Sequence, residues 1–312
     1  MNVVFMGTPE FAIPSLEKLI KHHNVVAVIS QPDKPKGRGK KLVPTPIKEF
    51  ALNNGIENIL QPTSIKDKNF IPELQKLNAD IFVVVAYGQI LSEEILNIPK
   101  YKCINVHGSL LPKYRGAAPI QWSIINGDAK TGVTIMYMEK GLDCGDMILK
   151  KEIEITKDET YKSLHDKMAV VGADALIEAL NLIYLGKSNP EKQNDALSTY
   201  APIITKETGH IDWNNNSKDI INLIRGLNPI PMAYTIYKNE IFKICKAEEI
   251  FEYNNSVGKI GEIIDVINKR GIVVKTKNSA ILITEIQANG KKKMNTADYL
   301  RGNNIDKGIV LC

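Results

Sequence analysis

The sequence predicts an α/β protein in which a doubly wound, mostly parallel sheet is followed by a smaller domain built as a β-barrel. Up to residue 185, short apolar runs alternate with stretches of helical spacing. Such an alternation builds a parallel sheet that is covered by helices on both faces. The continuous Val- and Ile-rich run at residues 81–86 is typical of a strand buried on both faces. From residue 233 onward the pattern changes to short strands joined by tight turns, which favours a small barrel.

The individual elements follow from the spacing of apolar residues, which differs between strands and helices. The first domain is expected to contain strands at residues 3–6, 25–29, 81–86, 103–106 and 133–138. Its expected helices cover residues 11–21, 47–53, 72–77, 118–125 and, as a long amphipathic helix, 161–185. The second domain is expected to contain a helix at residues 217–227 and strands at 234–237, 241–245, 272–276 and 280–284.

The length of the chain, 312 residues, is enough for two domains, because one domain usually takes about 100–200 residues. A polar stretch around Pro190 predicts the connection between them. We therefore expect a first domain over residues 1–189, a linker over residues 190–206 and a second domain over residues 207–312.

Several protein classes are excluded by what the sequence lacks. Its longest unbroken apolar run covers residues 81–87, whereas a membrane helix needs about 20 such residues. The start has neither the basic stretch nor the long apolar run of a signal peptide. The cysteines are not spaced as zinc ligands or as CxxC pairs; they are Cys103, Cys144, Cys245 and Cys312. We expect a cytoplasmic protein with reduced thiols, no membrane contact and no metal.

The positive charge of the chain is concentrated in one segment, residues 31–48. The formal net charge is +5, and this segment alone carries six basic residues against the single acid Asp33. The basic residues are Lys34, Lys36, Arg38, Lys40, Lys41 and Lys48. Because the segment is also rich in Pro and Gly, we expect a loop rather than one face of a helix. A loop of this kind suits a phosphate-bearing partner.

Candidate catalytic groups follow two of the expected strands. Asn105 and His107 lie at the end of a buried strand, and their spacing of two residues points both side chains to the same side. Ligands of doubly wound sheets bind beyond the carboxyl ends of the strands. The turn at residues 141–146 offers two acids, Asp143 and Asp146, and spacing alone does not choose between them. The simpler interpretation is a structural histidine and an ordinary β-turn.

These segments resemble a known family. The run Asn-Val-His-Gly-Ser-Leu-Leu-Pro at residues 105–112, followed by Arg-Gly-Ala-Ala-Pro at residues 115–119, is similar to the signature of folate-dependent formyltransferases. The resemblance implies a Rossmann-like catalytic domain, 10-formyltetrahydrofolate as co-substrate and no metal. It also implies the catalytic set Asn105, His107 and Asp143. Its implied folate-facing wall consists of Ser109, Leu110, Leu111 and Pro112.

The implied reaction needs groups of this kind. When an amine attacks a formyl carbon, the carbonyl oxygen becomes an oxyanion, and hydrogen-bond donors aimed at it stabilise the transition state. The Asn105 amide and the His107 imidazole are suitable donors. Asp143 can orient His107 and accept or relay the proton of the amine.

Further segments resemble the branch of this family that formylates methionine attached to initiator tRNA. They are residues 31–35 with 37–41, and residues 44–48, 83–88, 211–213 and 225–229. This resemblance implies a charged initiator tRNA as partner. The cations of the basic segment suit its phosphates, so we expect Arg38, Lys40 and Lys41 to contact the tRNA. The expected small barrel resembles an OB-fold, and we expect the protein to be a monomer. One departure is Asn-Pro-Ile-Pro at residues 228–231, where many relatives have an aromatic residue before the second proline.

Three alternatives share part of this evidence. A formyltransferase for another amine, such as an amino sugar nucleotide or glycinamide ribonucleotide, would use the same three catalytic residues but would not need residues 37–41. A hydrolase could use Cys144 with His107, although Cys144 lacks an activating motif. A tRNA-binding protein without catalysis would not need the catalytic set.

Overall fold

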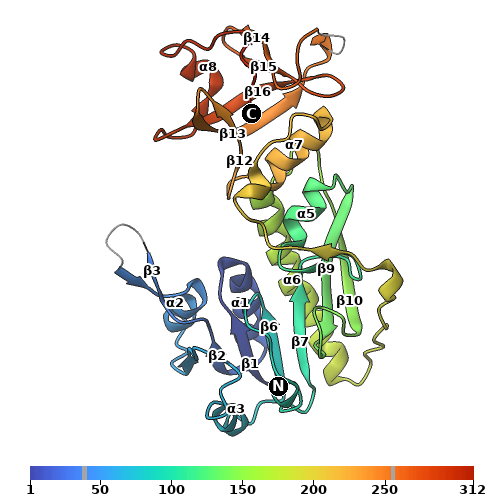
Figure 1. Cartoon of the computed structure of the whole chain (residues 1–312). Helices are drawn as coiled ribbons and strands as arrows, with labels where there is room; N and C mark the ends of the chain where they lie inside the picture. The colour runs from blue at the N-terminus through green and yellow to red at the C-terminus, as the bar shows by residue number, and fades with distance from the viewer. Residues whose placement is uncertain (37–40, 254–256) are drawn as a thin grey trace. The chain divides into compact units, whose positions relative to one another are not determined.

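The computed structural model describes residues 1–36, 41–253 and 257–312, which form two compact units (Figure 1). Unit 1 consists of Met1–Pro119, Lys130–Glu154 and His165–Ala201. Unit 2 consists of Ile120–Ala129, Ile155–Leu164 and Pro202–Cys312. Packing therefore groups segments that are separated in the sequence.

Unit 1 is built on a sheet whose strands, within the described residues, follow the order β10-β9-β7-β6-β1-β2-β5. Neighbours from β7 to β5 pair in parallel, whereas β9 runs antiparallel to β7 and forms a hairpin with β10. The bounds are β1 Asn2–Gly7, β2 Asn24–Ile29, β5 Ile59–Leu60, β6 Ile81–Val85, β7 Cys103–His107, β9 Lys130–Tyr137 and β10 Met147–Glu154. The expected mostly parallel sheet is thus confirmed, and β10 is an addition to it.

Helices cover both faces of this sheet. On one face, α3 (Ile71–Lys76) and α4 (Glu93–Leu96) share a core cluster with Phe82 and Cys103. On the other face lies α6 (Tyr161–Tyr184), where a Cβ added at Gly172 would stand 3.0 Å from Val106. The remaining helical elements of unit 1 are η1 Glu10–Ala12, α1 Ile13–His22, α2 Pro46–Asn53 and η2 Asp195–Leu197. Because Val106 faces α6, its neighbours Asn105 and His107 face the opposite side.

The basic segment contains a short hairpin that the sequence did not predict. β3 (Lys34–Lys36) pairs antiparallel with β4 (Lys41–Val43). At its base, Lys48 Nζ lies 2.6 Å from Asp33 Oδ2 and 2.7 Å from Gln61 Oε1. The pKa of Asp33 lies below its usual value, first because Gln61 Nε2 donates to Asp33 Oδ1 at 2.7 Å and then because of the bond from Lys48. The expected tRNA contacts Arg38 and Lys40 lie outside the described residues, and Lys41 is exposed at the start of β4.

The chain returns across unit 1 after α6, through residues 191–201, here named the return segment. Its first residue, Glu191, forms an antiparallel bridge with Met147. Its last two residues form β11 (Tyr200–Ala201), which pairs in parallel with β8 (Arg115–Gly116). The return segment therefore contacts the start of β10 and the segment that follows β7.

Unit 2 contains an antiparallel sheet with the strand order β12-β13-β16-β15-β14, and β17 pairs with β16. The strands are β12 Ala233–Tyr237, β13 Glu240–Glu249, β14 Ile263–Ile267, β15 Gly271–Lys275, β16 Ala280–Ala288 and β17 Met294–Asn295. The helical elements are α5 Pro119–Ile125, η3 Glu207–Gly209, α7 Ser217–Gly226, η4 Phe251–Tyr253 and α8 Thr296–Tyr299. Trp213 and the α7 residues Ile220 and Ile224 belong to its apolar core. In the parts of the chain that the structure describes, no helix is long and apolar enough to cross a membrane.

Candidate active site

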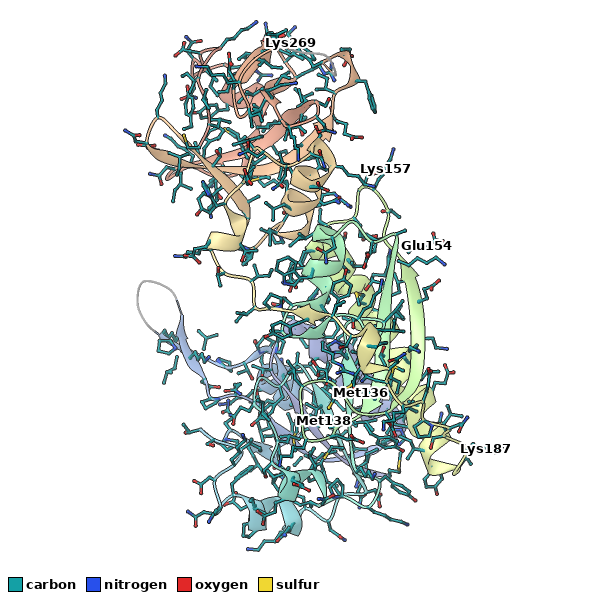
Figure 2. The ribbon with its side chains drawn as sticks, turned by 45° about the vertical axis from the view of Figure 1, so that its right-hand side comes forward. Met136, Met138, Glu154, Lys157, Lys187 and Lys269 are labelled. Atoms are coloured by element: carbon teal, nitrogen blue, oxygen red, sulfur yellow. The ribbon has the colours of Figure 1, made fainter. Side chains whose placement is uncertain are left out.

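The strand β7 carries Asn105 and His107 on one face. In the register of the sheet, Asn105 lies beside Met136 of β9 and His107 lies beside Thr134 (Figure 2 labels Met136). Side chains directly opposite in neighbouring strands share a face. The face away from α6 therefore presents an amide and an imidazole at the carboxyl end of β7, as the spacing of the two residues predicted.

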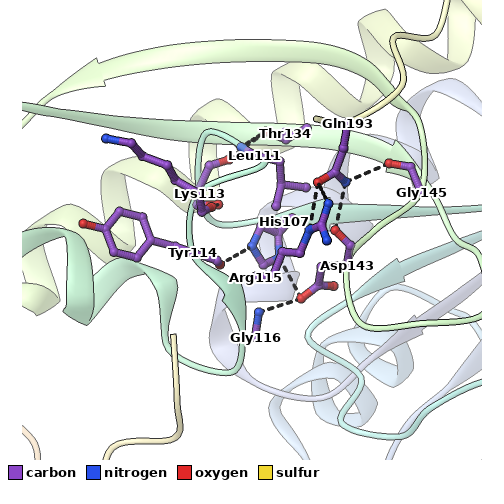
Figure 3. Close-up of polar contacts among 11 residues, drawn as sticks. His107, Leu111, Lys113, Tyr114, Arg115, Gly116, Thr134, Asp143, Gly145 and Gln193 are labelled. Atoms are coloured by element: carbon purple, nitrogen blue, oxygen red, sulfur yellow. Dashed lines mark hydrogen bonds and ion pairs between the residues drawn. The ribbon is translucent and has the colours of Figure 1, made fainter. Parts of the chain in front are cut away.

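His107 is buried, with 5% of its surface exposed. Its Nε2 lies 2.9 Å from the carbonyl oxygen of Tyr114, and its Nδ1 lies 3.6 Å from Oδ2 of Asp143 (Figure 3). With its proton on Nε2, the ring donates to Tyr114 and turns Nδ1 toward the carboxylate. The Nε2–H bond to Tyr114 fixes the orientation of the ring, and Nδ1 donates to the Asp143 carboxylate only when it also carries a proton.

Asp143 lies in the loop between β9 and β10 and is the acid that the structure brings to His107. Its Oδ2 also accepts a hydrogen bond of 2.9 Å from the backbone N–H of Gly116. Its backbone has φ of 50°, a left-handed conformation that residues other than glycine seldom adopt. The other acid of this turn, Asp146, uses its backbone oxygen to accept from Tyr137.

Asn105 is half-buried and differs from His107 in its bonding. Its side-chain amide makes no hydrogen bond to another residue among those the structure describes. The structure therefore brings His107 and Asp143 into contact and leaves the Asn105 amide available two residues away on the same face.

The four residues of the expected folate wall divide into two pairs. Ser109 and Leu111 are buried, and both bond to Thr134: its Oγ1 donates to Ser109 O at 2.7 Å and accepts from Leu111 N at 3.1 Å. Leu110 and Pro112 alternate with them and are half-buried. The buried pair fixes the shape of this loop, and Leu110 and Pro112 keep surface for a ligand.

A residue that the sequence did not single out, Gln193, joins the two loops of the site. Its Nε2 donates to the carbonyl oxygens of Asp143 and Gly145, both at 2.8 Å. Its Oε1 accepts from Nε and Nη2 of Arg115 at 3.0 and 2.8 Å (Figure 3). Nothing in the sequence pointed to it, because its partner Asp143 is separated from it by 50 positions.

The structure offers Cys144 no place in this arrangement. Its Sγ lies 3.8 Å from the carbonyl oxygen of Lys140, in its own turn. Among the residues that the structure describes, no group of three or more His, Cys, Asp or Glu side chains could hold a metal ion.

A hollow of about 570 Å³ lies beside the basic hairpin in unit 1. It is lined by Thr8 and Gln31, which follow β1 and β2, and by Lys34, Val43 and Phe50 among others. Thr8 and Gln31 both donate to the carbonyl oxygen of Tyr87, at 2.9 and 3.2 Å.

The class of the protein follows from this fold and from the protein-family models that match it. The model described as "Formyl transferase" matches residues 1–180. The model described as "Formyl transferase, C-terminal domain" matches residues 203–304. The protein is therefore a formyl transferase that carries both the catalytic-domain and the C-terminal-domain models of the family, and residues 105–119 had indicated this class.

Comparison with individual proteins narrows the class. The chain is 51% identical over 313 residues to the methionyl-tRNA formyltransferase of Caldanaerobacter subterraneus subsp. tengcongensis, with all of both chains covered. It is 53% identical to that of Clostridium tetani, covering 100% of this chain and 99% of the relative. The chain belongs to the family of methionyl-tRNA formyltransferases.

Solved structures support the fold at lower sequence identity. An N-formyltransferase from Helicobacter canadensis, in complex with folinic acid and dTDP-3-aminofucose, matches with a TM-score of 0.68 and 22% identity, covering 92% of this chain and 99% of that one. HypX from Aquifex aeolicus, in complex with tetrahydrofolic acid, matches with a TM-score of 0.64 and 16% identity, covering 96% of this chain and 47% of that one.

Proposed function

We propose that this chain transfers the formyl group of 10-formyltetrahydrofolate to the α-amino group of methionine on initiator tRNA. The product, N-formylmethionyl-tRNA, would serve translation initiation. The observation that carries the proposal is the His107–Asp143 pair at the carboxyl end of β7, in a chain similar over its full length to methionyl-tRNA formyltransferases.

The proposed reaction is a transfer through a tetrahedral intermediate. The neutral amine attacks the formyl carbon, and the carbonyl oxygen becomes an oxyanion to which the Asn105 amide donates. In this structure the Nε2 hydrogen of His107 donates to the carbonyl oxygen of Tyr114, so the ring donates to the oxyanion only after it turns away from that carbonyl. An α-amino group has a pKa of about 8, so part of it is neutral near pH 7. Asp143, which lies 3.6 Å from Nδ1 of His107, orients the ring and accepts the proton lost by the amine. The C–N bond to the folate then breaks, and the folate nitrogen keeps the electron pair and gains a proton.

The co-substrate fits the loop that follows β7. Leu110 and Pro112 supply apolar surface, and Ser109 and Leu111 hold the loop in shape through Thr134. A mostly apolar wall with a few polar groups is suited to the ring of a folate. The chemistry itself needs no metal, since the developing charge is met by side-chain donors.

The tRNA would be bound by charge at the basic hairpin and by unit 2. Arg38, Lys40 and Lys41 are the proposed contacts, because phosphate binding draws on clustered cations. The antiparallel sheet of unit 2 supports an OB-like domain, a scaffold that often binds nucleic acid. We assign catalysis to residues 1–189 and tRNA binding to residues 207–312, joined by residues 190–206, in a cytoplasmic monomer.

An acceptor competition tests the proposal. Purified protein is given 10-formyltetrahydrofolate together with methionyl initiator tRNA, charged elongator tRNA and a nucleotide-linked amino sugar. We expect the initiator tRNA to be preferred by a factor on the order of 100. Preference for the amino sugar would favour a different formyltransferase, and tRNA binding without transfer would favour a non-catalytic protein.

Two variants serve as controls for the assigned roles. His107→Ala and Asp143→Asn should each lower kcat by roughly 100-fold or more, because general acid–base catalysis is typically worth that much. The affinity for tRNA should stay near that of the unmodified protein. Near-normal turnover of His107→Ala would show that the catalytic assignment is wrong.

A further inference from the structure

The contacts that hold His107 and Asp143 in place are made or supported by the return segment, residues 191–201. Asp143 is held by the side chain of Gln193, which binds its backbone oxygen. Its carboxylate is held by the N–H of Gly116, which pairs with Ala201 in β8 and β11. The ring of His107 is held by the carbonyl of Tyr114, whose own N–H donates to Thr199 Oγ1 at 2.8 Å.

Gln193 is the centre of this arrangement because it is buried and fully bonded. Only 5% of its surface is exposed. Its two amide hydrogens go to the Asp143 and Gly145 carbonyls, and its oxygen accepts twice from Arg115. A side-chain amide has two donor hydrogens and two acceptor positions, so all four are used.

The conformation of Asp143 needs such support. A left-handed φ of 50° at a residue with a Cβ is intrinsically unfavourable and persists only where the surroundings fix it. The two bonds from Gln193 hold the backbone at Asp143 and Gly145, directly at this position. Without them, the loop could relax and the carboxylate would move away from His107.

We propose that Gln193 is a positioning residue that sets the distance between His107 and Asp143, a role that rests on the function proposed above. It touches neither the reacting atoms nor the ring of His107. It acts through the backbone of Asp143 and so through the proton-accepting carboxylate. The return segment, expected from the sequence to be a linker, thus contributes to turnover.

The test compares Gln193→Met in two backgrounds. Methionine keeps the volume of the side chain and removes all four hydrogen bonds. In the otherwise unmodified protein we expect kcat to fall roughly 10- to 100-fold, since small misplacements of reacting groups have effects of this size, with both KM values nearly unchanged. In the Asp143→Asn background the same substitution should lower kcat less than about twofold, because changes that act through one group do not add.

A matched control and a second variant complete the design. Asn58→Ala removes an exposed amide that also braces unit 1, through a bond of 2.9 Å to Val26 O, and should leave kcat unchanged. If Gln193→Met does not fold, Gln193→Glu replaces it, because a carboxylate still accepts from Arg115 while the two donor bonds are lost. Circular dichroism establishes folding for every variant.

The outcomes distinguish the positioning role of Gln193 from the proposed function. An equal loss of kcat in both backgrounds, or no loss in a folded Gln193 variant, would overturn the positioning role and leave the proposed function standing. Near-normal turnover of Asp143→Asn alone would instead overturn the proposed role of the carboxylate.

Discussion

At the scale of single residues, burial separates the four cysteines. Cys103 and Cys245 are buried, Cys144 is half-buried and Cys312 is exposed. Burial raises the pKa of the Cys245 thiol to about 11 and also raises that of Cys103. Because the thiolate is the reactive form, the two buried cysteines should be inert at neutral pH.

Alkylation with iodoacetamide tests this difference. At pH 7.5 we expect Cys312 and Cys144 to be modified in the folded protein and Cys103 and Cys245 to stay protected. A raised pKa keeps the thiol protonated until the pH approaches it, so Cys245 should gain reactivity only toward pH 11. Mass spectrometry before and after denaturation gives the measurement, and rapid labelling of Cys245 at pH 7.5 would contradict it. Cys144→Ser should remain active.

The candidate residues were predictable to different degrees. Asn105 and His107 could be placed because the period of a strand fixes which side chains share a face. Asp143 could not be chosen over Asp146 from spacing, because the choice depends on how a turn meets Gly116 and His107. Gln193 had no sequence signal at all, because its role comes from contacts between segments far apart in the chain.

At the scale of elements, long apolar runs predicted the buried strands, whereas the charged residues of β10 hid its strand pattern. β6 and β7 were recognisable because they are buried. β10 carries Lys150, Lys151, Glu152 and Glu154 and lies at the edge of the sheet, where charged side chains are common. Such a strand lacks a clear alternation, and its antiparallel hairpin with β9 was not expected.

The pairing of β8 with β11 leads to a prediction about Gly116. Gly116 has φ of 121°, and a Cβ there would lie 2.7 Å from Ala201 O. Gly116→Ala should therefore part the two strands and displace the N–H that holds Asp143. We expect a loss of stability of about 1–3 kcal/mol and a lower kcat, measured by thermal unfolding and the transfer assay.

Gly186 offers the matched control for this substitution. It also has a positive φ, 64°, but a Cβ there would meet nothing within 4 Å. Gly186→Ala should cost about 1 kcal/mol from the unfavourable backbone conformation alone and should leave kcat unchanged. Equal activity of the two variants would mean that the Gly116 contact does not matter for turnover.

At the scale of the whole molecule, the dominant feature is the concentration of positive charge in residues 31–48. Asp33, Lys48 and Gln61 form a partly buried brace at the base of that segment. The brace anchors the hairpin on unit 1, and Lys41, at the start of β4, is exposed. A partner bound mainly through phosphates should be sensitive to salt.

The salt dependence of tRNA use tests this role. Arg38→Ala should raise KM for tRNA, spare KM for the folate, and reduce the slope of log(1/KM) against log[salt] by about 1. Lys187→Ala removes the same charge from an exposed position just after α6 (Figure 2) and should leave the slope unchanged. Identical slopes for all three proteins would remove the hairpin from the tRNA-binding surface.

Unit 2 is assembled from three separate segments of the chain, and this limits how the gene can be divided into halves. The helix α5 and residues 155–164 pack with α7: Gly226 lies against Ile125, and Arg225 donates to the carbonyls of Thr156 and Glu159. A fragment ending near residue 189 would keep α5 but lose α7 and leave apolar surface uncovered. A fragment starting near residue 207 would lack these inserted pieces. Expression of separate halves should therefore begin from a permuted or grafted chain, in which each half carries all of its own segments.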